Sequence, residues 1–368
     1  MRILQIINNL STGGAEKLII DSIPLLKKKG IEVDLLVLDN TLTPYMKQFK
    51  ELNCCKIYSL GKGKLYNPLN VFKIIPYLKK YDLVHVHLFP AQYWVATAKI
   101  ISFSKTKLIF TEHNTSNKRM QNFIFRTLDK NIYRFYNKVI CITNEVKNVL
   151  VEYCEFKSKD ICVIENGINL DTIVNSKALL KKQINGKILE SDKLIIQIAG
   201  FRAQKDQKTV IRSLKYLNEN IKLLLVGEGG LIEDCIELVN QLGLTRRVFF
   251  LGVRIDVPNL LKTADLSIVS SHWEGFGLVA VEGMASGKPV IASNVPGLSN
   301  VVQGGGILFE KGNEKELAAI ITKLLSDNDY YNKVTNSGME ISKKFSINVM
   351  IEKQLSLYQD LFKNNHGK

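Results

Sequence analysis

The stretch ADLSIVSSHWEGFGLVAVEGMASGKPVIAS, residues 264–293, decides the fold class. An apolar strand leads into a loop with two glycines, then a short helical segment and a second strand, which together predict a βαβ unit. Ligands of open parallel sheets bind at the C-terminal ends of strands, so the loop from His272 to Gly277 lies where a site is expected. Its glycines let backbone N–H groups approach a phosphate closely.

The helical segment after this loop carries one charged side chain between Gly275 and Gly287, that of Glu282. Because the segment is otherwise apolar on every face, we expect the helix and its carboxylate to be buried. A buried carboxylate needs hydrogen-bond donors, and sugar hydroxyls would serve.

Two glutamates eight positions apart, Glu274 and Glu282, enclose Gly-Phe-Gly and precede Met-Ala, Gly and Pro-Val. This pattern resembles the signature of the retaining family 4 glycosyltransferases, and the resemblance covers nearly the whole chain. It implies an α/β architecture of the GT-B type, with two doubly wound, Rossmann-like domains that face each other across a cleft. It also implies that Glu282 holds the ribose hydroxyls of a nucleotide sugar and that Glu274 lies by the donor sugar. The amides between them, at Gly275, Phe276, Gly277 and Leu278, would face the sugar and the pyrophosphate.

Strands and helices alternate along the chain, which predicts parallel sheets with helices on both faces. We expect a first domain over residues 1–172, a linker over 173–192 that lacks strand character, and a second domain over 193–346. The resemblance implies that the helical segment 347–368 crosses back to the first domain. The expected strands begin near residues 3, 31, 83, 107, 139 and 161 in the first domain and near 194, 223 and 248, before the quoted unit, in the second.

Two features of the first domain are candidate parts of the site. Gly13 and Gly14 lie between an expected strand and helix, where a glycine turn is the plain interpretation, but the resemblance places this Gly-Gly-Ala-Glu loop under the reaction centre. His87 and His113 fall just past strand ends. His87 is equally explained as a histidine that satisfies loop backbone. For His113 the resemblance implies contact with the donor sugar and the acceptor region.

Cations follow the first strand of the second domain, at Arg202 and Lys205. Each charge-assisted hydrogen bond to a pyrophosphate contributes on the order of 1.5 to 3 kcal/mol. The family pattern has an arginine five positions before the lysine, whereas this chain has Gly200 there, with Arg202 two residues later. Gly227 resembles part of another donor-side loop. Arg254 lies near the position that holds the base in the family, and a solvated arginine explains it equally well.

Composition sets outer limits. The chain has 368 residues, enough for two cores, and its hydrophobic fraction of 46% argues against disorder. The six cysteines lack metal-site or disulfide-scaffold spacing, so we expect reduced, structural thiols.

The start lacks a secretory pattern and no apolar run approaches membrane-spanning length, so we expect a cytoplasmic protein, with the inner face of the cell membrane as a further location. The net charge of +15 favours an anionic partner: nucleotide, membrane surface or nucleic acid.

A metal-dependent transferase would carry Asp-x-Asp at a strand end, and residues 327–329 have that spelling. They fall between two helical patterns, so we expect a solvated turn. No cluster of histidine and cysteine indicates a structural metal. We therefore expect a metal-independent enzyme that has no cofactor and uses the nucleotide sugar as co-substrate.

Four cations, Arg126, Lys130, Arg134 and Lys138, recur every four residues in a segment that we expect to be helical. On one helix they would form a single stripe. A solvated face of a basic protein explains the pattern. The resemblance implies the other interpretation, a first-domain face that rests on an anionic bilayer and takes a lipid-linked glycan.

These observations predict transfer of a sugar from a UDP- or GDP-sugar to a glycan or lipid-linked glycan, with retention implied by the resemblance and surface polysaccharide synthesis as the setting. A nucleotide-sugar 2-epimerase of the same fold is an alternative. A glycosidase needs carboxylates roughly 5 to 9 Å apart, whereas helix positions eight residues apart are about 12 Å apart, and phosphate-binding groups would be superfluous. A nucleic-acid-binding module is indicated by charge alone and by no motif, so we expect no nucleic acid partner.

Overall fold

The structure is a computed structural model and describes residues 1–115, 122–154 and 160–363. The chain divides into two compact units. The first comprises Met1–Gly167 and Ile347–Lys368, and the second comprises Ile168–Ser346. Residues 173–192, where we expected a linker, lie in the second unit and include the end of α7 (Leu170–Val174) and all of α8 (Lys181–Ile184).

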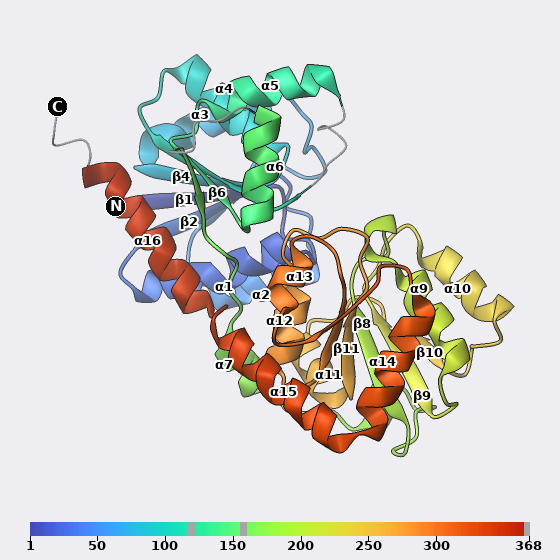
Figure 1. Cartoon of the computed structure of the whole chain (residues 1–368). Helices are drawn as coiled ribbons and strands as arrows, with labels where there is room; N and C mark the ends of the chain where they lie inside the picture. Colours follow the sequence, from blue (N-terminus) through green and yellow to red (C-terminus); the bar gives the residue numbers. More distant parts are fainter. Residues whose placement is uncertain (116–121, 155–159, 364–368) are drawn as a thin grey trace. The chain divides into compact units, whose positions relative to one another are not determined.

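In the described residues of the first unit, seven parallel strands form one sheet in the order β3-β2-β1-β4-β5-β6-β7. Its strands are β1 (Arg2–Ile7), β2 (Glu32–Val37), β3 (Ile57–Ser59), β4 (Leu83–His87), β5 (Lys107–Glu112), β6 (Lys138–Cys141) and β7 (Ile161–Val163). The helices are α1 (Gly14–Lys28), α2 (Pro44–Leu52), α3 (Asn70–Lys80), α4 (Ala91–Ser102), α5 (Phe123–Tyr133), α6 (Asn144–Cys154) and α16 (Ile347–Lys363). Figure 1 shows α3, α4 and α5 above this sheet and α1, α2 and α16 below it.

The central strands are buried on both faces because helices cover both. All five residues of β4 are buried, as are the last five of β1, and such strands contain nearly continuous apolar runs. The strand order reverses between β1 and β4, so the loops after these strands meet at the C-terminal edge of the sheet.

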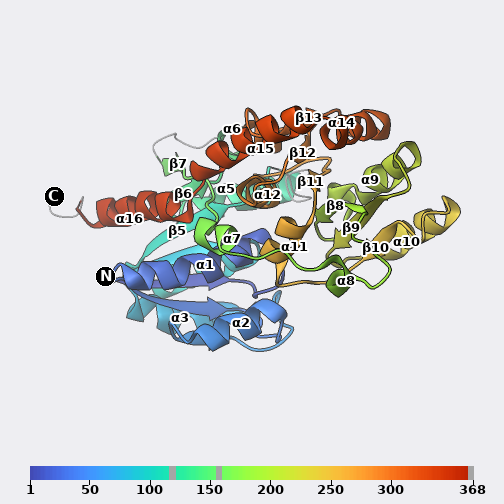
Figure 2. The same cartoon turned by 90° about the horizontal axis from the view of Figure 1, so that it is seen from below.

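Helix α1 shows how local sequence sets an element's ends. Gly13 precedes its first turn, and Gly30 follows its last turn with φ +78°, a left-handed conformation that glycine adopts without strain. Helix α16 packs beside α1 (Figure 2), where Lys29 and Glu352 form an ion pair. The C-terminal helix is therefore part of the first unit.

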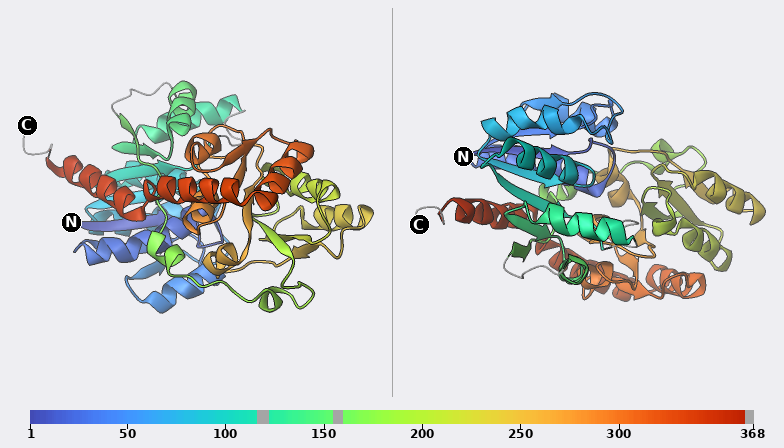
Figure 3. Two further views of the ribbon diagram at one scale, coloured as in Figure 1. Left: turned by 60° about the horizontal axis from the view of Figure 1, so that its bottom comes forward. Right: turned by 90° about the horizontal axis from the view of Figure 1, so that it is seen from above.

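The second unit, all of whose residues are described, contains a six-stranded parallel sheet in the order β10-β9-β8-β11-β12-β13. Its strands are β8 (Lys193–Ile198), β9 (Ile221–Val226), β10 (Val248–Phe250), β11 (Leu266–Val269), β12 (Val290–Ser293) and β13 (Ile307–Phe309). Besides α7 and α8, its α-helices are α9 (Gln207–Ser213), α10 (Ile232–Gln241), α11 (Val257–Thr263), α12 (Leu278–Ala285), α13 (Leu298–Val302), α14 (Glu314–Ser326) and α15 (Asn328–Lys343). Figure 3 shows helices on both sides of each sheet.

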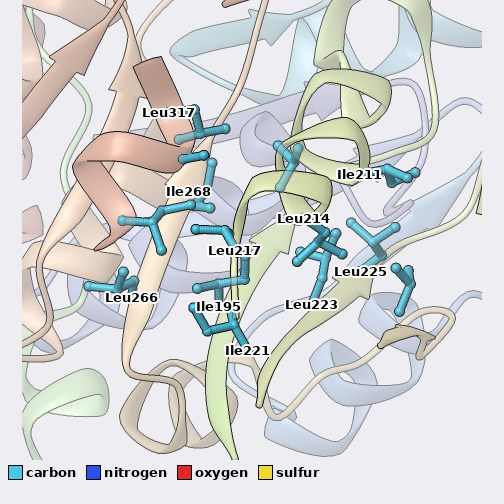
Figure 4. Packing of buried hydrophobic residues seen from close by; sticks show 14 of the residues in the cluster. Ile195, Ile211, Leu214, Leu217, Ile221, Leu223, Leu225, Leu266, Ile268 and Leu317 are labelled. Carbon is cyan, nitrogen blue, oxygen red and sulfur yellow. The ribbon is translucent and has the colours of Figure 1, made fainter. Parts of the chain in front are cut away.

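Side chains of β8 and β9 alternate between two cores. Ile195 and Leu223 face a cluster completed by α9, α10 and α14 (Figure 4). Ile196 and Leu224, the next residues along, face the opposite cluster with α8 and α11. Because successive strand residues point to opposite faces, a strand that is apolar at every position requires a layer of helices on each side.

Candidate functional site

The second unit brings two separate stretches of sequence together at one edge of its sheet. Its strand order reverses between β8 and β11, which are neighbours. Both strands are parallel, so the loop after β8, residues 199–206, and the loop after β11, residues 270–277, emerge at the same edge. This is the topological switch point at which ligands of doubly wound sheets bind.

An ion pair joins the two loops. The ammonium of Lys205 contacts Oε2 of Glu274, and their side chains are 24% and 13% exposed. Glu274 also accepts from the hydroxyl of Ser271 at 3.4 Å and from its neighbouring amide, Gly275, at 3.3 Å. The structure thus brings together two predicted site residues that are far apart in sequence, with their charges half-buried at the ligand-binding edge.

Further hydrogen bonds hold the loops in register. The amide of His272 donates to the carbonyl of Gln204 at 2.8 Å, and the side chain of Gln204 donates to the carbonyl of Trp273 at 2.9 Å. Ser270 Oγ donates to the carbonyl of Asp206 at 2.8 Å. Asp206 has φ 41° and caps α9, which turns the chain sharply after Lys205. Our sequence analysis missed Asp206, although an aspartate before a helical pattern is a typical cap signal.

The loop after β11 ends at the N-terminus of α12. Gly277 adopts φ +85° at the cap, and no described residue accepts a hydrogen bond from the amides of Leu278 or Val279 in the first helical turn. A helix N-terminus with available N–H groups favours an anion. The loop packs on Gly297, where a Cβ would lie 2.3 Å from the carbonyl oxygen of Glu274. Sequence reasoning did not single out Gly297.

The sequence predicted a buried carboxylate at Glu282, and the structure differs from that prediction. Helix α12 is buried along most of its length, as predicted, yet Glu282 itself is half-buried. It follows Leu278 by four residues, so it lies on the same side of the helix as the first-turn amide of Leu278. Glu282 is therefore not fully enclosed in the core.

The side chain of Arg202 reaches back towards position 200. It is exposed, and its Nε lies 3.6 Å from the point where a Cβ on Gly200 would be. The guanidinium from two residues later therefore lies beside the position that the family pattern assigns to arginine. A Cβ at position 200 would also lie 3.3 Å from the carbonyl oxygen of Glu228, a tight contact that glycine avoids.

Gly227 follows β9 and Arg254 lies in the loop after β10, the two strands next to β8 on the side away from β11. A Cβ on Gly227, which has φ +134°, would be 2.3 Å from the carbonyl oxygen of Ala199, so this loop packs directly on the loop after β8. Arg254 makes two bonds to the carboxylate of Asp256, with Nε to Oδ1 at 2.7 Å. Its hydrogen bond lowers the pKa of Asp256. Arg254 is half-buried, so it is not a freely solvated cation.

In the first unit, Gly13 and Gly14 begin α1 at the end of the loop after β1. Glu16 braces this loop: its Oε1 accepts from Ser11 Oγ at 2.9 Å, and a Cβ on Gly13 would lie 2.3 Å from its Oε2. A residue larger than glycine at position 13 would therefore force the Glu16 carboxylate to move. Asn8 links the loop after β1 to the loop after β4, because its side-chain amide donates to the carbonyl of Phe89 at 2.7 Å.

His87 and His113 are in contact. His87 is the last residue of β4, His113 follows β5, and their Nδ1 and Nε2 atoms are 3.2 Å apart. Burial lowers the pKa of His87 well below its usual value and that of His113 to about 4, so both rings are neutral at pH 7. His87 binds side chains and not loop backbone. His85, which we did not single out, is also buried, between Tyr358 and Thr111.

The four-cation stripe is wrong as a structural prediction. Helix α5 ends at Tyr133, and Lys138 opens β6. Arg126 donates through Nε to the carbonyl of Tyr153 at 3.0 Å and is half-buried, whereas Arg134 is exposed. The predicted helix was too long because Phe135-Tyr136 fits a helical pattern and a strand approach equally well.

The exposed face of α5 is largely apolar instead. Phe123 is 81% exposed and Ile124 is 68% exposed, and Leu128, four residues after Ile124, is also exposed. Phe103 at the end of α4 is exposed as well, and α4 packs against α5. Exposed apolar side chains grouped on one helix indicate contact with an apolar partner.

Residues 327–329 are exposed, and Asp327 caps α15 by accepting from the amide of Tyr330 at 2.9 Å. The Asp-x-Asp spelling is thus explained by a helix start. In the part of the chain that the structure describes, no group of three or more His, Cys, Asp or Glu side chains is arranged to hold a metal ion.

Among the described residues, no helix combines the length and apolarity needed to cross a bilayer. The six cysteines are all free thiols.

Comparison with known families accounts for most of the chain. Residues 12–172 match the model described as Glycosyltransferase Family 4, and residues 181–340 match that of Glycosyl transferases group 1.

Curated relatives extend over much of the chain's length. The N-acetyl-alpha-D-glucosaminyl L-malate synthase of Bacillus anthracis is 28% identical, over 78% of this chain and 77% of its own. The UDP-Gal:alpha-D-GlcNAc-diphosphoundecaprenol alpha-1,3-galactosyltransferase of Escherichia coli is 24% identical, over 95% of each.

Among solved structures, Anabaena HepE in complex with UDP and glucose has a TM-score of 0.85 at 21% identity, covering 98% of this chain and 99% of its own. The sucrose-phosphate synthase of Thermosynechococcus elongatus has a TM-score of 0.79 at 20% identity, covering 99% and 100%. The two parallel-sheet units and these neighbours confirm the predicted GT-B fold.

Proposed function

The chain belongs to glycosyltransferase family 4, and from this premise we propose that it transfers a sugar from a nucleotide diphosphate sugar to a glycan or lipid-linked glycan, with retention at the anomeric carbon. The observation that carries the proposal is the Lys205–Glu274 pair beside the available amides of α12 at the switch point. A cation, a carboxylate and helix N–H groups together match the charged and hydroxylated parts of a nucleotide sugar.

The second unit would bind the donor. Lys205, Arg202 and the amides of the loop after β11 would hold the diphosphate, and Glu282 would accept hydrogen bonds from the ribose hydroxyls. During transfer the bond between the anomeric carbon and the diphosphate oxygen breaks, the acceptor oxygen bonds to that carbon, and the proton of the acceptor hydroxyl passes to the departing diphosphate. Negative charge grows on the diphosphate, which is where fixed cations and amides lower the barrier.

The donor would be a UDP- or GDP-sugar. UDP-sugars should be tested first, because the Escherichia coli relative is named for UDP-Gal and similar structures contain UDP or UDP-glucose. We also propose that no metal is needed, because Lys205 and Arg202 supply positive charge near the diphosphate position.

The acceptor would be a lipid-linked glycan used in surface polysaccharide synthesis. Two relatives are named for acceptors on diphosphoundecaprenol. The exposed apolar face of α5 and the exposed Arg134 fit the interface of an anionic membrane, to which the protein would bind peripherally on its cytoplasmic side. His113, in the same unit, would orient the acceptor and the donor sugar.

One experiment separates the reaction classes. The protein is incubated with radiolabelled UDP-sugars and GDP-sugars, with and without a membrane extract that supplies lipid-linked glycans. Label entering the lipid fraction only when the extract is present supports transfer. Donor epimerisation without acceptor would identify an epimerase, and glycan breakdown without nucleotide would identify a glycosidase. Absence of label transfer from every donor, with nucleotide still bound, would contradict the proposal.

A further inference from the structure

A chain of buried polar side chains runs through the first unit to His113. Nε2 of His87 lies 2.9 Å from Oε1 of Gln5, and Nδ1 of His87 lies 3.2 Å from Nε2 of His113. These residues come from β1, from the end of β4 and from the loop after β5. Together they line a cavity of about 20 Å³, roughly the space of one water molecule.

The amide oxygen of Gln5 faces His87, since its Oε1 lies 2.9 Å from Nε2 of that ring. Gln5 is buried inside strand β1, where its side chain needs a partner. The oxygen of Gln5 therefore accepts a hydrogen bond from His87.

The hydrogen-bond directions at His87 follow from this contact. An amide oxygen only accepts, so Nε2 of His87 carries the ring proton and Nδ1 is unprotonated in the neutral ring. Nδ1 therefore accepts from Nε2–H of His113. His85 lies between two hydroxyls, with Nδ1 2.6 Å from that of Tyr358 and Nε2 2.7 Å from that of Thr111, and each hydroxyl can donate or accept.

These directions leave the lone pair of His113 on its Nδ1 atom. With its proton on Nε2, neutral His113 has an unprotonated Nδ1, which no described hydrogen bond uses. The low pKa values of His87 and His113 keep both rings neutral, so the directions hold at neutral pH. In this form His113 accepts a hydrogen bond from a hydroxyl, as sugars offer, and does not act as a cation.

We propose that Gln5 and His87 are positioning residues that fix the tautomer and ring orientation of His113, so that its Nδ1 accepts from a sugar hydroxyl. The contact between His113 and a sugar hydroxyl rests on the proposed function, whereas the tautomers are argued from the hydrogen bonds of Gln5, His87 and His113. A histidine whose second nitrogen is bound has its reactive nitrogen set by that bond.

The first test reads tautomers directly and needs no substrate. The chain has five histidines, so two-bond ¹H–¹⁵N correlation spectra of the ¹⁵N-histidine-labelled protein can be assigned with single His→Gln variants. We expect the proton on Nε2 in His87 and His113. A proton on Nδ1 of His113 in the wild type would overturn the proposal.

The second test compares two substitutions of His87. His87→Asn keeps an acceptor near the position of Nδ1, whereas His87→Gln keeps a donor near that of Nε2 and removes the acceptor. We expect His87→Gln to mix the two tautomers of His113 and lower kcat about tenfold or more, with little change in the KM for the nucleotide sugar. His87→Asn should retain the tautomer and most of the rate.

The outcomes separate the two proposals. An unchanged His113 tautomer in His87→Gln, or equal rate losses in both variants with equal melting temperatures, would overturn the positioning role. If His87→Gln does not fold, the wild-type spectrum and His87→Asn still decide. The expected tautomers in a protein that transfers no sugar would leave the hydrogen-bond relay standing and refute the proposed function.

Discussion

Lys205 and Glu274 form an ion pair although they are separated by more than sixty residues, because β8 and β11 are adjacent parallel strands whose following loops share one edge of the sheet. The pair is half-buried, so its charges are screened less than those of an exposed pair. A diphosphate at this edge would meet a lysine whose position is already set by the carboxylate.

Replacement of Lys205 by alanine should lower turnover by about a hundredfold, which corresponds to about 2.7 kcal/mol of lost barrier stabilisation. The cause is the loss of a fixed cation beside the leaving diphosphate. Arg202→Ala should have a smaller effect, because its guanidinium approaches from a displaced position. Steady-state rates with a saturating nucleotide sugar provide the measurement.

Lys208→Ala is the matched control for this prediction. Lys208 lies three residues from Lys205 and forms an ion pair with Asp234 at 2.9 Å, and both side chains of this pair are exposed. Its removal should leave the rate within about twofold of wild type. Near-normal rates in both Lys205→Ala and Arg202→Ala would mean that the diphosphate is held elsewhere.

Glu282→Gln should weaken nucleotide binding by about 1 to 3 kcal/mol, because an amide accepts hydrogen bonds from hydroxyls less strongly than a carboxylate does. The half-buried position of Glu282 predicts that the fold tolerates the change. Isothermal titration with UDP and GDP measures the affinity, and thermal melting checks the fold. Glu233→Gln, at an exposed position on α10, is the control. Unchanged affinity in Glu282→Gln would remove the ribose assignment.

Sugar transfer should survive EDTA. The expectation rests on Lys205, Arg202 and the α12 amides, which would neutralise the diphosphate without a divalent ion. Rates are compared before and after extensive chelation, and again after addition of magnesium or manganese. Complete loss with EDTA followed by recovery with either ion would show that the reaction depends on metal.

Stability should fall as the pH drops from 6.5 towards 5. Burial lowers the pKa of His85 to about 3 and that of His87 well below 6.5, whereas both titrate near 6.5 when the chain unfolds. Between these values the unfolded chain binds more protons, so the stabilisation is present above pH 6.5 and is lost on acidification. Each of these histidines should lower the free energy of unfolding by about 1 kcal/mol for each pH unit between pH 6.5 and pH 5.

Urea unfolding at pH 7 and pH 5 measures this effect. His87→Asn should reduce the difference between the two pH values, because it removes one of the depressed groups. His272→Gln is the control, since His272 is partly exposed on the loop after β11. Equal free energies of unfolding at both pH values in the wild type would show that the buried rings take up protons without unfolding.

Sequence alone predicted the fold and the juxtaposition of two loops for a simple geometric reason. Apolar runs mark parallel strands, and residues that follow parallel strands meet at one edge. The pattern therefore placed the loops that carry Lys205 and Glu274 at the same edge, whereas the roles of these residues in donor binding came from the resemblance and stay predictions. Glu282 was harder: periodicity identified a buried helix but not which way its single carboxylate points.

The hydrogen-bond relay to His113 depended on strand register, which the sequence does not specify. A glutamine inside the apolar strand RILQII and two histidines in LVHVH are polar residues in buried positions, and such residues require partners. This signal was available for Gln5 and His85. That Tyr358 completes the network depends on how α16 packs, which no local pattern shows.

The last prediction concerns membrane binding, where the structure changes which residues should matter. Electrostatic attraction remains, at about 1 kcal/mol for each cation near an anionic surface. Arg134 is exposed and suited to this, whereas Arg126 is occupied by the carbonyl of Tyr153. The exposed Phe123 and Ile124 add apolar area, and burial of each such side chain contributes about 1.5 to 3 kcal/mol.

Co-sedimentation with vesicles of anionic phospholipid tests this view. The wild type should bind at low salt and be partly released at high salt. Phe123→Ser/Ile124→Ser should lower the partition coefficient by about tenfold or more, and Arg134→Gln by about fivefold. Tyr216→Ser/Ile255→Ser removes two exposed apolar residues of the second unit and should have no effect on vesicle binding.

Wild-type protein that stays in the supernatant at low salt would show that α5 is not a membrane face. Equal binding by the α5 double variant, together with loss on replacing Arg126, Lys130, Arg134 and Lys138 by glutamine, would show that charge alone holds the protein there.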